Sequence, residues 1–385
     1  MGGRTRYRRG IVAASLLAAA LGLKDSSRET AGSAARTPAS APVVLITLDT
    51  VRADRLGCYG DAKAETPSLD SLARDGVRFA NAYTVVPITL PSHAVILTGT
   101  YPMWNGVRDF TSPGLPAGIP TLTSILKQHG YATAAFVSAF VLNSMWGLNR
   151  GFDVYDDESP SAAAPGNDPF LVTRPGDDTT SRMLAWLDGH AQKPFFIWLH
   201  LYDAHSPYRS PEPYRSRHAG HPYDGAIAFD DAQVDRVLDA LRRQSLYDQA
   251  LIVVTSDHGE SLGEHGEAEH GFFVYNATLR VPLIVKWPGS IGHGRVMTEP
   301  VSSVDLASTI ARAAEVPAAG ERTFQGKPLT RWLGDHVASP DPVYAESYYA
   351  RDSFGWHELR ALVRGFRAPK GCRSMHARAS LSLRI

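Results

Sequence analysis

Two polar clusters in this 385-residue chain carry side chains suited to binding a metal ion. Asp49 ends the apolar run VVLITLD, and Asp257 and His258 follow the run LIVVTSDH. Carboxylate oxygens neutralise the charge of a divalent cation, and an imidazole adds a borderline ligand. A single Asp after a strand more often caps a helix or forms a turn. The combination nevertheless predicts a metal site made of Asp49, Asp257 and His258.

A third cluster, TLPSHAVILTG, contains a candidate nucleophile, Thr89. A hydroxyl is a weak nucleophile at neutral pH and needs a base or a metal to activate it. A cation held by the three residues above would bind the Thr89 oxygen and lower the pKa of its hydroxyl. Residues Ser92 to Leu97 are expected to begin a helix whose amides bind an anion. In a simpler alternative, which stays open, Thr89 or Ser92 only caps that helix.

A sheet that brings distant strand ends together is needed to position these clusters. Apolar runs alternate with amphipathic segments along the whole chain, which predicts an α/β fold. The expected strands are 43–48, 79–85, one from 132, 194–205, 251–254 and 281–289; the expected helices are 66–76, one ending at 130, 179–190 and 225–249. We expect a large, mostly parallel or mixed sheet with helices on both faces, and Thr66 or Ser68 as the cap of the first helix. Ligands of such sheets bind beyond the carboxyl ends of the strands, where Asp49 and Asp257 fall.

The two ends of the chain differ from this body. Residues 1–23 combine arginines with a short apolar run, which predicts a secretory signal peptide or a membrane anchor. Residues 24–41 are rich in Ser, Ala, Thr and Pro and are expected to be a flexible linker. The catalytic domain is expected over residues 42–367, and an atypical basic tail over 368–385. We therefore expect an exported protein, periplasmic or extracellular, either free or anchored, that contacts a membrane only through its N-terminal segment.

Composition narrows the classes of function. Lys and Arg together number 39, as do Asp and Glu, so no net charge points to nucleic acid or to an acidic membrane as a partner. The hydrophobic content of 44% is normal for a globular protein with a sizeable core. Two cysteines exclude a disulfide framework.

Six passages of the chain resemble, in order, the sulfatase family of the alkaline phosphatase superfamily. They are VVLITLDTVRADRLGCYG, TPSLDSLARDGVRFANAY, TLPSHAVILTGTYP, HLYDAHSPY, VVTSDHGESLGEHG and LRVPLIVKWPG, within about residues 42–305. Six ordered matches are far more specific than any one motif. The resemblance implies an alkaline phosphatase-like fold and hydrolysis of a sulfate or phosphate ester through a covalent intermediate. It also implies a divalent metal ion, Ca, Mg or Mn, that bridges the nucleophile and an ester oxygen.

The resemblance implies roles for single residues as well. The three predicted metal ligands match the family's metal positions, and Thr89 stands at the nucleophile position and completes the metal shell. His205 matches a histidine that contacts the ester group, and His270 lies near the position of a basic residue that serves the leaving oxygen. We expect His93 and His205 to meet the charge that grows on the ester oxygens. His205 or His270 is expected to protonate the leaving alcohol.

The sequence also departs from the family pattern. Thr89 replaces the Cys or Ser that the family converts to formylglycine, a conversion that the methyl group of threonine prevents. His93 stands where the family has Arg, and Thr50 replaces a second Asp, so one metal ligand is missing. The basic tail lacks the usual closing motif, which is typical of a truncated C-terminal subdomain.

These departures leave three functions open. The favoured one is a metal-dependent sulfate ester hydrolase with an unmodified threonine. The others are a phosphodiester or phosphonate hydrolase or phosphoethanolamine-type transferase of the same superfamily, and an inactive family member. The expected partner is a small-molecule, glycan or lipid ester of sulfate or phosphate.

Overall fold

The computed structural model describes residues 41–158, 172–191, 194–316, 323–334, 340–364 and 380–384, the last of these by its backbone. All of them belong to one compact unit, Thr37–Ile385. The predicted signal or anchor, nearly all of the predicted linker and most of the predicted basic tail lie outside the described residues. Within the described part of the chain, no helix is long and apolar enough to cross a membrane.

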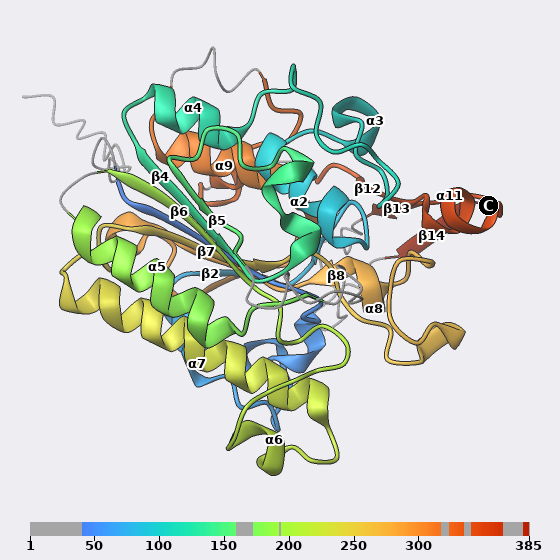
Figure 1. Ribbon diagram of the computed structural model, residues 1–385, viewed down its shortest axis with the longest axis horizontal. Helices are drawn as coiled ribbons and strands as arrows, with labels where there is room; N and C mark the ends of the chain where they lie inside the picture. Colours follow the sequence, from blue (N-terminus) through green and yellow to red (C-terminus); the bar gives the residue numbers. More distant parts are fainter. Residues whose placement is uncertain are drawn as a thin grey trace, which may run out of the picture. The chain divides into compact units, whose positions relative to one another are not determined.

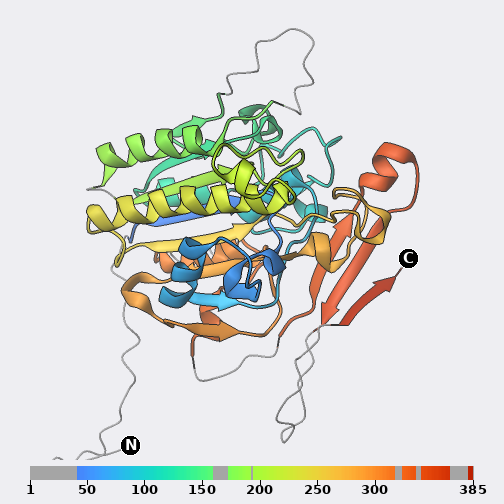
Figure 2. The same cartoon turned by 90° about the horizontal axis from the view of Figure 1, so that it is seen from below.

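An eight-stranded sheet forms the centre of this unit (Figures 1 and 2). In sheet order its strands are β10 (Arg295–Met297), β2 (Val77–Phe79), β9 (Leu283–Lys286), β7 (Leu251–Ser256), β1 (Val43–Leu48), β6 (Phe195–Leu201), β4 (Ala132–Val137) and β5 (Val154–Asp156). Strand β9 runs antiparallel to both of its neighbours, and the other pairs are parallel. The mostly parallel sheet that the sequence predicts is confirmed.

The register of the three central strands determines where the site forms. Leu48 at the end of β1 lies opposite Leu201 of β6 on one side and Ser256 of β7 on the other. The three strands therefore leave the sheet side by side at one edge. This register delivers Asp49 and Asp257, which are far apart in sequence, to the same place.

Helices cover both faces of the sheet, as predicted (Figure 1). Alternate residues of β1 point into two separate cores, with Val44 and Ile46 in one and Val43 and Leu45 in the other. The first core is covered by α1 (Pro67–Asp75), α5 (Gly176–His190) and α7 (Pro222–Arg243); the second is covered by α2 (Thr89–Thr98), α4 (Leu122–Gln128) and α9 (Asp305–Ala313). The shorter helices are α3 (Pro102–Asn105), α6 (Tyr214–Arg217), α8 (Asn276–Leu279) and α11 (Tyr349–Phe354).

Two small sheets complete the unit. One contains β11 (Val301–Ser302), β3 (Ala82–Tyr83) and β8 (Arg280–Val281); the other contains β12 (Val343–Ser347), β13 (Leu359–Arg364) and β14 (Ser380–Arg384). The single strand expected over 79–85 is wrong, because the chain there divides between β2 and β3 in different sheets. Strand β14 lies in the segment predicted as a basic tail and pairs antiparallel with β13.

The C-terminal sheet contacts the loops that carry the candidate catalytic residues. The amide of Glu346 in β12 donates to the carbonyl of Val85, shortly before Thr89. The hydroxyl of Ser347, also in β12, donates to the carbonyl of Gly271, which follows His270. One strand is therefore hydrogen-bonded to both loops.

Helix α1 begins at a cap that the sequence does not reveal. Thr66 is the N-cap residue but makes no side-chain capping hydrogen bond. Asp231 of α7 instead accepts hydrogen bonds from the amides of Ser68 and Leu69, at 3.1 and 2.8 Å. The predicted N-cap position, Thr66, is therefore confirmed, but its side chain does not satisfy the free amides. A carboxylate from another helix satisfies the free amides and favours the positive end of the α1 dipole.

We expect Asp231→Ala to lower the free energy of unfolding by about 1–2 kcal/mol, the usual cost of losing a cap. Burial raises the pKa of Asp231 to about 6, so urea unfolding at pH 8 keeps its carboxylate ionised. The control is Asp239→Ala, an exposed α7 position paired with Arg242, which should change stability by about 0.5 kcal/mol or less. Equal losses in the two variants would contradict the capping role.

Candidate active site

Three of the predicted metal ligands converge at the edge of the sheet. Ligand atoms of Asp49, Asp257 and His258 all lie within 4.8 Å of one another. The Nε2 atom of His258 lies 4.0 Å from Asp49 Oδ1 and 3.4 Å from Asp257 Oδ2. All three side chains are fully buried. This spacing is short enough for one cation to contact all three residues at ordinary ligand distances of about 2 Å.

We call Asp49, Asp257 and His258 the metal-ligand group. The hydrogen bonds of the two carboxylates use one oxygen of each and leave the other oxygen facing this group. Asp49 Oδ2 accepts from His200 Nε2 at 3.0 Å. Asp257 Oδ1 accepts from the amides of His258 and Thr50, at 2.9 and 3.3 Å. Among the described residues, Asp49 Oδ1 and Asp257 Oδ2 are buried without any hydrogen-bond partner. A buried carboxylate oxygen without a partner destabilises the folded state unless a positive charge compensates it. These two oxygens therefore fit a divalent cation.

The electrostatics of the pair agree with this interpretation. Burial, followed by the nearby charge of Asp257, raises the pKa of Asp49 well above its usual range. Despite its burial, Asp257 has a pKa below its usual range, because His258, His93 and His200 lie close to it. A positive charge between the two carboxylates would favour the ionised form of Asp49 as well.

His258 presents a lone pair to the group. Its Nδ1 lies 2.9 Å from the carbonyl of Gly259. A carbonyl only accepts hydrogen bonds, so Nδ1 carries the proton and Nε2 is unprotonated. Metal-binding histidines commonly fix their tautomer in this way. Gly259 is required here, since a Cβ at this position would lie 2.0 Å from the carbonyl oxygen of Ala277.

Thr89 begins helix α2 beside this lone pair. Its Oγ1 lies 3.2 Å from His258 Nε2, and the residue is 2% exposed. Because Nε2 is unprotonated, the hydroxyl donates to it. The helix starts three residues earlier than expected, which Pro91 permits because a proline fits the first turn of a helix. The capping alternative is wrong, because no side chain caps α2 and the Ser92 hydroxyl donates instead to the carbonyl of Asp257 at 2.7 Å.

Comparison with known proteins assigns the chain to a family. The model of the Sulfatase family matches residues 42–316. The chain belongs to the sulfatase family. Among its relatives, steryl-sulfatase of Mus musculus is 28% identical, over 87% of this chain and 72% of that protein. Arylsulfatase A of Homo sapiens is 29% identical, over 71% of this chain and 64% of that protein.

Solved structures agree on the fold of this sulfatase-family protein. The phosphonate monoester hydrolase of Agrobacterium radiobacter superposes with a TM-score of 0.70 at 22% identity, over 84% of this chain and 86% of that one. A protein solved with its substrate D-glucosamine-2-N,6-O-disulfate gives 0.69 at 21% identity, over 84% and 87%. The family resemblance and the alkaline phosphatase-like fold are thus confirmed. The protein is a sulfatase-like ester hydrolase.

His93 of this sulfatase-family protein contacts the backbone of the candidate nucleophile. Its Nδ1 lies 2.8 Å from the Thr89 carbonyl, and its Nε2 lies 3.1 Å from Thr47 Oγ1. Trp198 Nε1 donates to the same Thr47 oxygen at 2.9 Å. Burial lowers the pKa of His93, and the side chain is 0% exposed. These contacts hold the first turn of α2, and the expected role of His93 at the ester oxygens stays a prediction.

His205 and His270 lie next to the metal-ligand group. The ring of His270 is centred 4.3 Å from that of His258 and 5.0 Å from that of His205. Burial lowers the pKa of His270 to about 4, and burial together with His270 lowers that of His205 to about 4. The Nδ1 of His205 donates to the carbonyl of Ser206 at 2.8 Å, which leaves its Nε2 as an acceptor. Both imidazoles adjoin the metal-ligand group, and their expected roles toward the leaving alcohol stay predictions.

The prediction from sequence missed His200, which orients Asp49. It lies opposite Thr47 in β6, and the amide of Ser138 donates to its Nδ1 at 3.4 Å. Its Nε2–H therefore faces Asp49. A polar residue near the end of a predicted buried strand is the signal that would have found it.

Thr50, where the family has a second Asp, faces away from the metal-ligand group. Its Oγ1 lies 2.7 Å from the carbonyl of Ala204, and its amide faces Asp257. The residue adopts a φ of 58°, in the left-handed region. At this position the backbone amide of Thr50, and not a second carboxylate, lies next to Asp257. No further negative charge is therefore added there.

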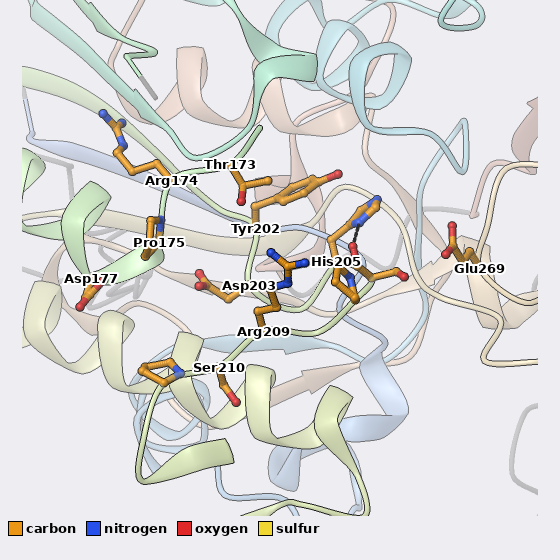
Figure 3. Close-up of a pocket in the computed structure, with 13 residues that line it drawn as sticks. Thr173, Arg174, Pro175, Asp177, Tyr202, Asp203, His205, Arg209, Ser210 and Glu269 are labelled. Carbon is orange, nitrogen blue, oxygen red and sulfur yellow. Dashed lines mark hydrogen bonds between the residues drawn. The ribbon is translucent and has the colours of Figure 1, made fainter. Parts of the chain in front are cut away.

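An open pocket of about 930 Å³ adjoins the site (Figure 3). Tyr202 and His205 lie on its wall, with their rings stacked 4.3 Å apart. Arg209, Asp203 and Glu269 also line it. The pocket therefore presents hydrogen-bonding groups of both charges to whatever extends from the site.

Proposed function

We propose that this protein hydrolyses sulfate monoesters with a divalent cation and with unmodified Thr89 as the nucleophile. The observation that carries the proposal is the position of the Thr89 hydroxyl, 3.2 Å from His258 Nε2, beside the unpartnered oxygens of Asp49 and Asp257. The sulfatases among its relatives support the choice of sulfate. A cation of Ca, Mg or Mn would be held by these three residues and Thr89, and would lower the pKa of the hydroxyl and polarise the ester.

The residues of the chain would then perform the first step. Helix α2 aims Thr89 Oγ1 at the ester, and His93 fixes the Thr89 peptide through its carbonyl. The Thr89 oxygen, after losing its proton to solvent, attacks sulfur in line while the bond from sulfur to the alcohol oxygen breaks. The product of this step is a sulfate ester of Thr89.

Proton transfer would accompany both steps. Burial lowers the pKa of His270 to about 4, so only a minor fraction of the ring is protonated at neutral pH; in that form it gives its Nε2 proton to the departing alcohol oxygen. The neutral ring then takes a proton from the water that attacks the threonyl ester, and Thr89 leaves as the ester bond breaks. The net reaction converts ester and water into alcohol and hydrogen sulfate. His205, stacked on Tyr202 at the pocket wall, is the other candidate for contact with the ester and its alcohol.

A charge count favours monoanionic substrates. Among the described residues, neither Asp49 nor Asp257 has a Lys or Arg nitrogen within 4.0 Å. Two carboxylates balance one divalent cation, so the site offers little further attraction to a second negative charge. A sulfate monoester carries one charge, whereas a phosphate monoester carries nearly two at pH 7. Phosphodiesters and phosphonate monoesters also carry one, which keeps such a hydrolase as the second candidate function.

The full chain, purified with Ca, Mg or Mn in turn, tests the proposal on nitrophenyl esters. We expect kcat/KM for the sulfate to exceed that for the phosphate monoester by at least about tenfold, since about 1.4 kcal/mol of repulsion is a factor of ten. Faster cleavage of a phosphonate monoester would establish the second candidate instead. Release of a phosphoryl or sulfuryl group only to an added alcohol would indicate a transferase. No turnover and no bound metal would indicate an inactive member.

We also infer export from residues 1–23. N-terminal sequencing of the protein from its native cell, together with fractionation of that cell, tests this inference. Recovery from the cytoplasm with the arginine-rich segment intact would contradict it.

A further inference from the structure

A closed circle of side chains surrounds the space next to the metal-ligand group. Each side chain contacts the next in the order Asp49, His200, Tyr202, His205, His270 and His258, which lies beside Asp49 again. The ring centroids from His200 to His258 are 5.9, 4.3, 5.0 and 4.3 Å apart along this order. Asp49 closes the circle, with Oδ2 at 3.0 Å from His200 Nε2 and Oδ1 at 4.0 Å from His258 Nε2. An ester bound at the metal-ligand group therefore lies against this side-chain circle.

Tyr202 brings a hydroxyl without a partner to the side-chain circle. The residue lines the pocket beside the site and is 8% exposed. Within the described part of the chain its hydroxyl makes no hydrogen bond, and its oxygen is open to solvent, unlike the buried unpartnered oxygens of Asp49 and Asp257. Figure 3 shows the hydroxyl end of Tyr202 next to the ring of His205. The stacked ring thus holds the hydroxyl in place while leaving it free to bind a ligand.

Hydrogen-bond donors of this kind are scarce around the metal-ligand group. His205 uses its Nδ1–H on the carbonyl of Ser206, so the neutral ring offers only an acceptor at Nε2. In the chain as far as the structure describes it, no Lys or Arg nitrogen lies within 4.0 Å of Asp49 or Asp257. The oxygens of a sulfate ester only accept hydrogen bonds, so they need a donor. The hydroxyl of Tyr202 fits this need.

The hydroxyl acts as a donor without any change of charge. A tyrosine has an ordinary pKa of about 10, so its hydroxyl is protonated at neutral pH. Burial raises the pKa of Tyr202 well above that range. A neutral donor also adds no attraction for a second negative charge, which agrees with the preference for monoanionic esters.

We propose that Tyr202 is a catalytic residue whose hydroxyl donates a hydrogen bond to a sulfuryl oxygen of the ester and so holds the sulfur in line with Thr89. The proposal rests on the proposed function, because it concerns the same ester. Tyr202 is three contacts away from His258 in either direction round the side-chain circle, and Thr89 lies beside His258. A sulfuryl group between them meets the attacking oxygen on one side and the donor on the other. The hydroxyl keeps its proton in both steps.

Tyr202→Phe tests the proposal, because it removes the hydroxyl and keeps the stacked ring. Losing one donor to the reacting group typically costs about 10²-fold or more, so we expect kcat/KM to fall about 100-fold. The loss should be similar for phenyl sulfate and nitrophenyl sulfate, because both esters have the same sulfuryl group. A loss confined to phenyl sulfate would place the hydroxyl at the leaving oxygen and overturn the proposal. Unchanged kcat/KM on both esters would overturn it as well, since Tyr202 would then only pack against His205.

Tyr131→Phe is the matched control. Tyr131 is a buried tyrosine directly before β4, and its hydroxyl donates to the carbonyl of Ala41 at 3.1 Å, outside the side-chain circle. We expect this variant to lose stability through the missing hydrogen bond but to keep kcat/KM within about twofold of the wild-type value. A fall in kcat/KM as large as that of Tyr202→Phe would mean that the loss of any buried hydroxyl impairs the enzyme, and it would overturn the assignment to Tyr202.

Binding of inorganic sulfate gives a readout that does not need turnover. In calorimetric titrations of the full chain with sodium sulfate in the presence of Mn, we expect Tyr202→Phe to raise the Kd about tenfold, as the loss of a hydrogen bond to a charged group does. Equal Kd values in the two proteins would overturn the proposal. A wild type that binds sulfate but cleaves no ester would refute the proposed function, and the two Kd values would still decide whether the hydroxyl contacts the anion. A wild type that neither cleaves esters nor binds sulfate would overturn both proposals.

Discussion

Thr89→Ala is expected to lower kcat/KM for a sulfate ester by about 10⁴-fold or more, as the loss of a covalent nucleophile does in other hydrolases. Thr89 is the hydroxyl that helix α2 places beside the lone pair of His258. Its loss removes the attacking atom and leaves only cation and substrate binding. Because the residue is buried, thermal unfolding must show that the variant is folded before its rate is interpreted.

Thr89→Ser and Thr89→Val separate the hydroxyl from the shape of the side chain. The serine variant keeps the hydroxyl, so its kcat/KM should stay within about tenfold of the wild-type value. The valine variant keeps only the volume of the side chain, so its kcat/KM should be as low as that of the alanine variant. Mass spectrometry of wild-type protein quenched during turnover should find a sulfuryl group on the peptide that contains Thr89. Turnover that survives in the alanine variant would mean that water attacks the ester directly.

Asp49→Asn is expected to abolish stabilisation of the protein by divalent cations. A cation that binds only the folded state at 100 times its Kd stabilises the wild type by about 2.7 kcal/mol. The substitution removes the charge of one of the two carboxylates that have an unpartnered oxygen. The amide oxygen of the new asparagine can still accept the hydrogen bond from His200 Nε2. Without added cation the variant should be at least as stable as the wild type, because one of two adjacent buried charges is gone. Activity should fall in parallel with the lost thermal shift.

Asp230→Asn is the control for this measurement. Asp230 is also fully buried with both oxygens unpartnered among the described residues, but it lies in α7 outside the metal-ligand group. We expect its variant to keep the cation-dependent rise in melting temperature. Scanning calorimetry with Ca, Mg and Mn also ranks the three metals. A cation effect that persists unchanged in Asp49→Asn would mean that the ion binds elsewhere.

The sequence predicted those parts of the site that depend on strand ends. β1 has the predicted bounds, Val43–Leu48, because a buried parallel strand is a continuous apolar run with a polar residue after it. Two such runs on neighbouring strands were enough to bring Asp49, Asp257 and His258 together. The family motifs then added Thr89, which the structure places beside them.

The sequence did not predict the residues whose roles depend on partners that are distant along the chain. His200 reads as part of an apolar strand, and its contact with Asp49 spans 151 positions. Asp231 reads as one acid of an amphipathic helix, and its contact with the first turn of α1 spans 163 positions. Local patterns cannot report such pairings.

Strand β12 is hydrogen-bonded through Glu346 to the carbonyl of Val85, four residues before Thr89, and through Ser347 to the carbonyl of Gly271, which follows His270. Thermal motion of this strand is therefore expected to carry the Thr89 hydroxyl and the His270 ring in the same direction, so that the distance between them varies less than either position does. Heating that detaches the small C-terminal sheet would decouple the two loops while the large sheet is still intact. Inactivation of this protein would then precede its melting.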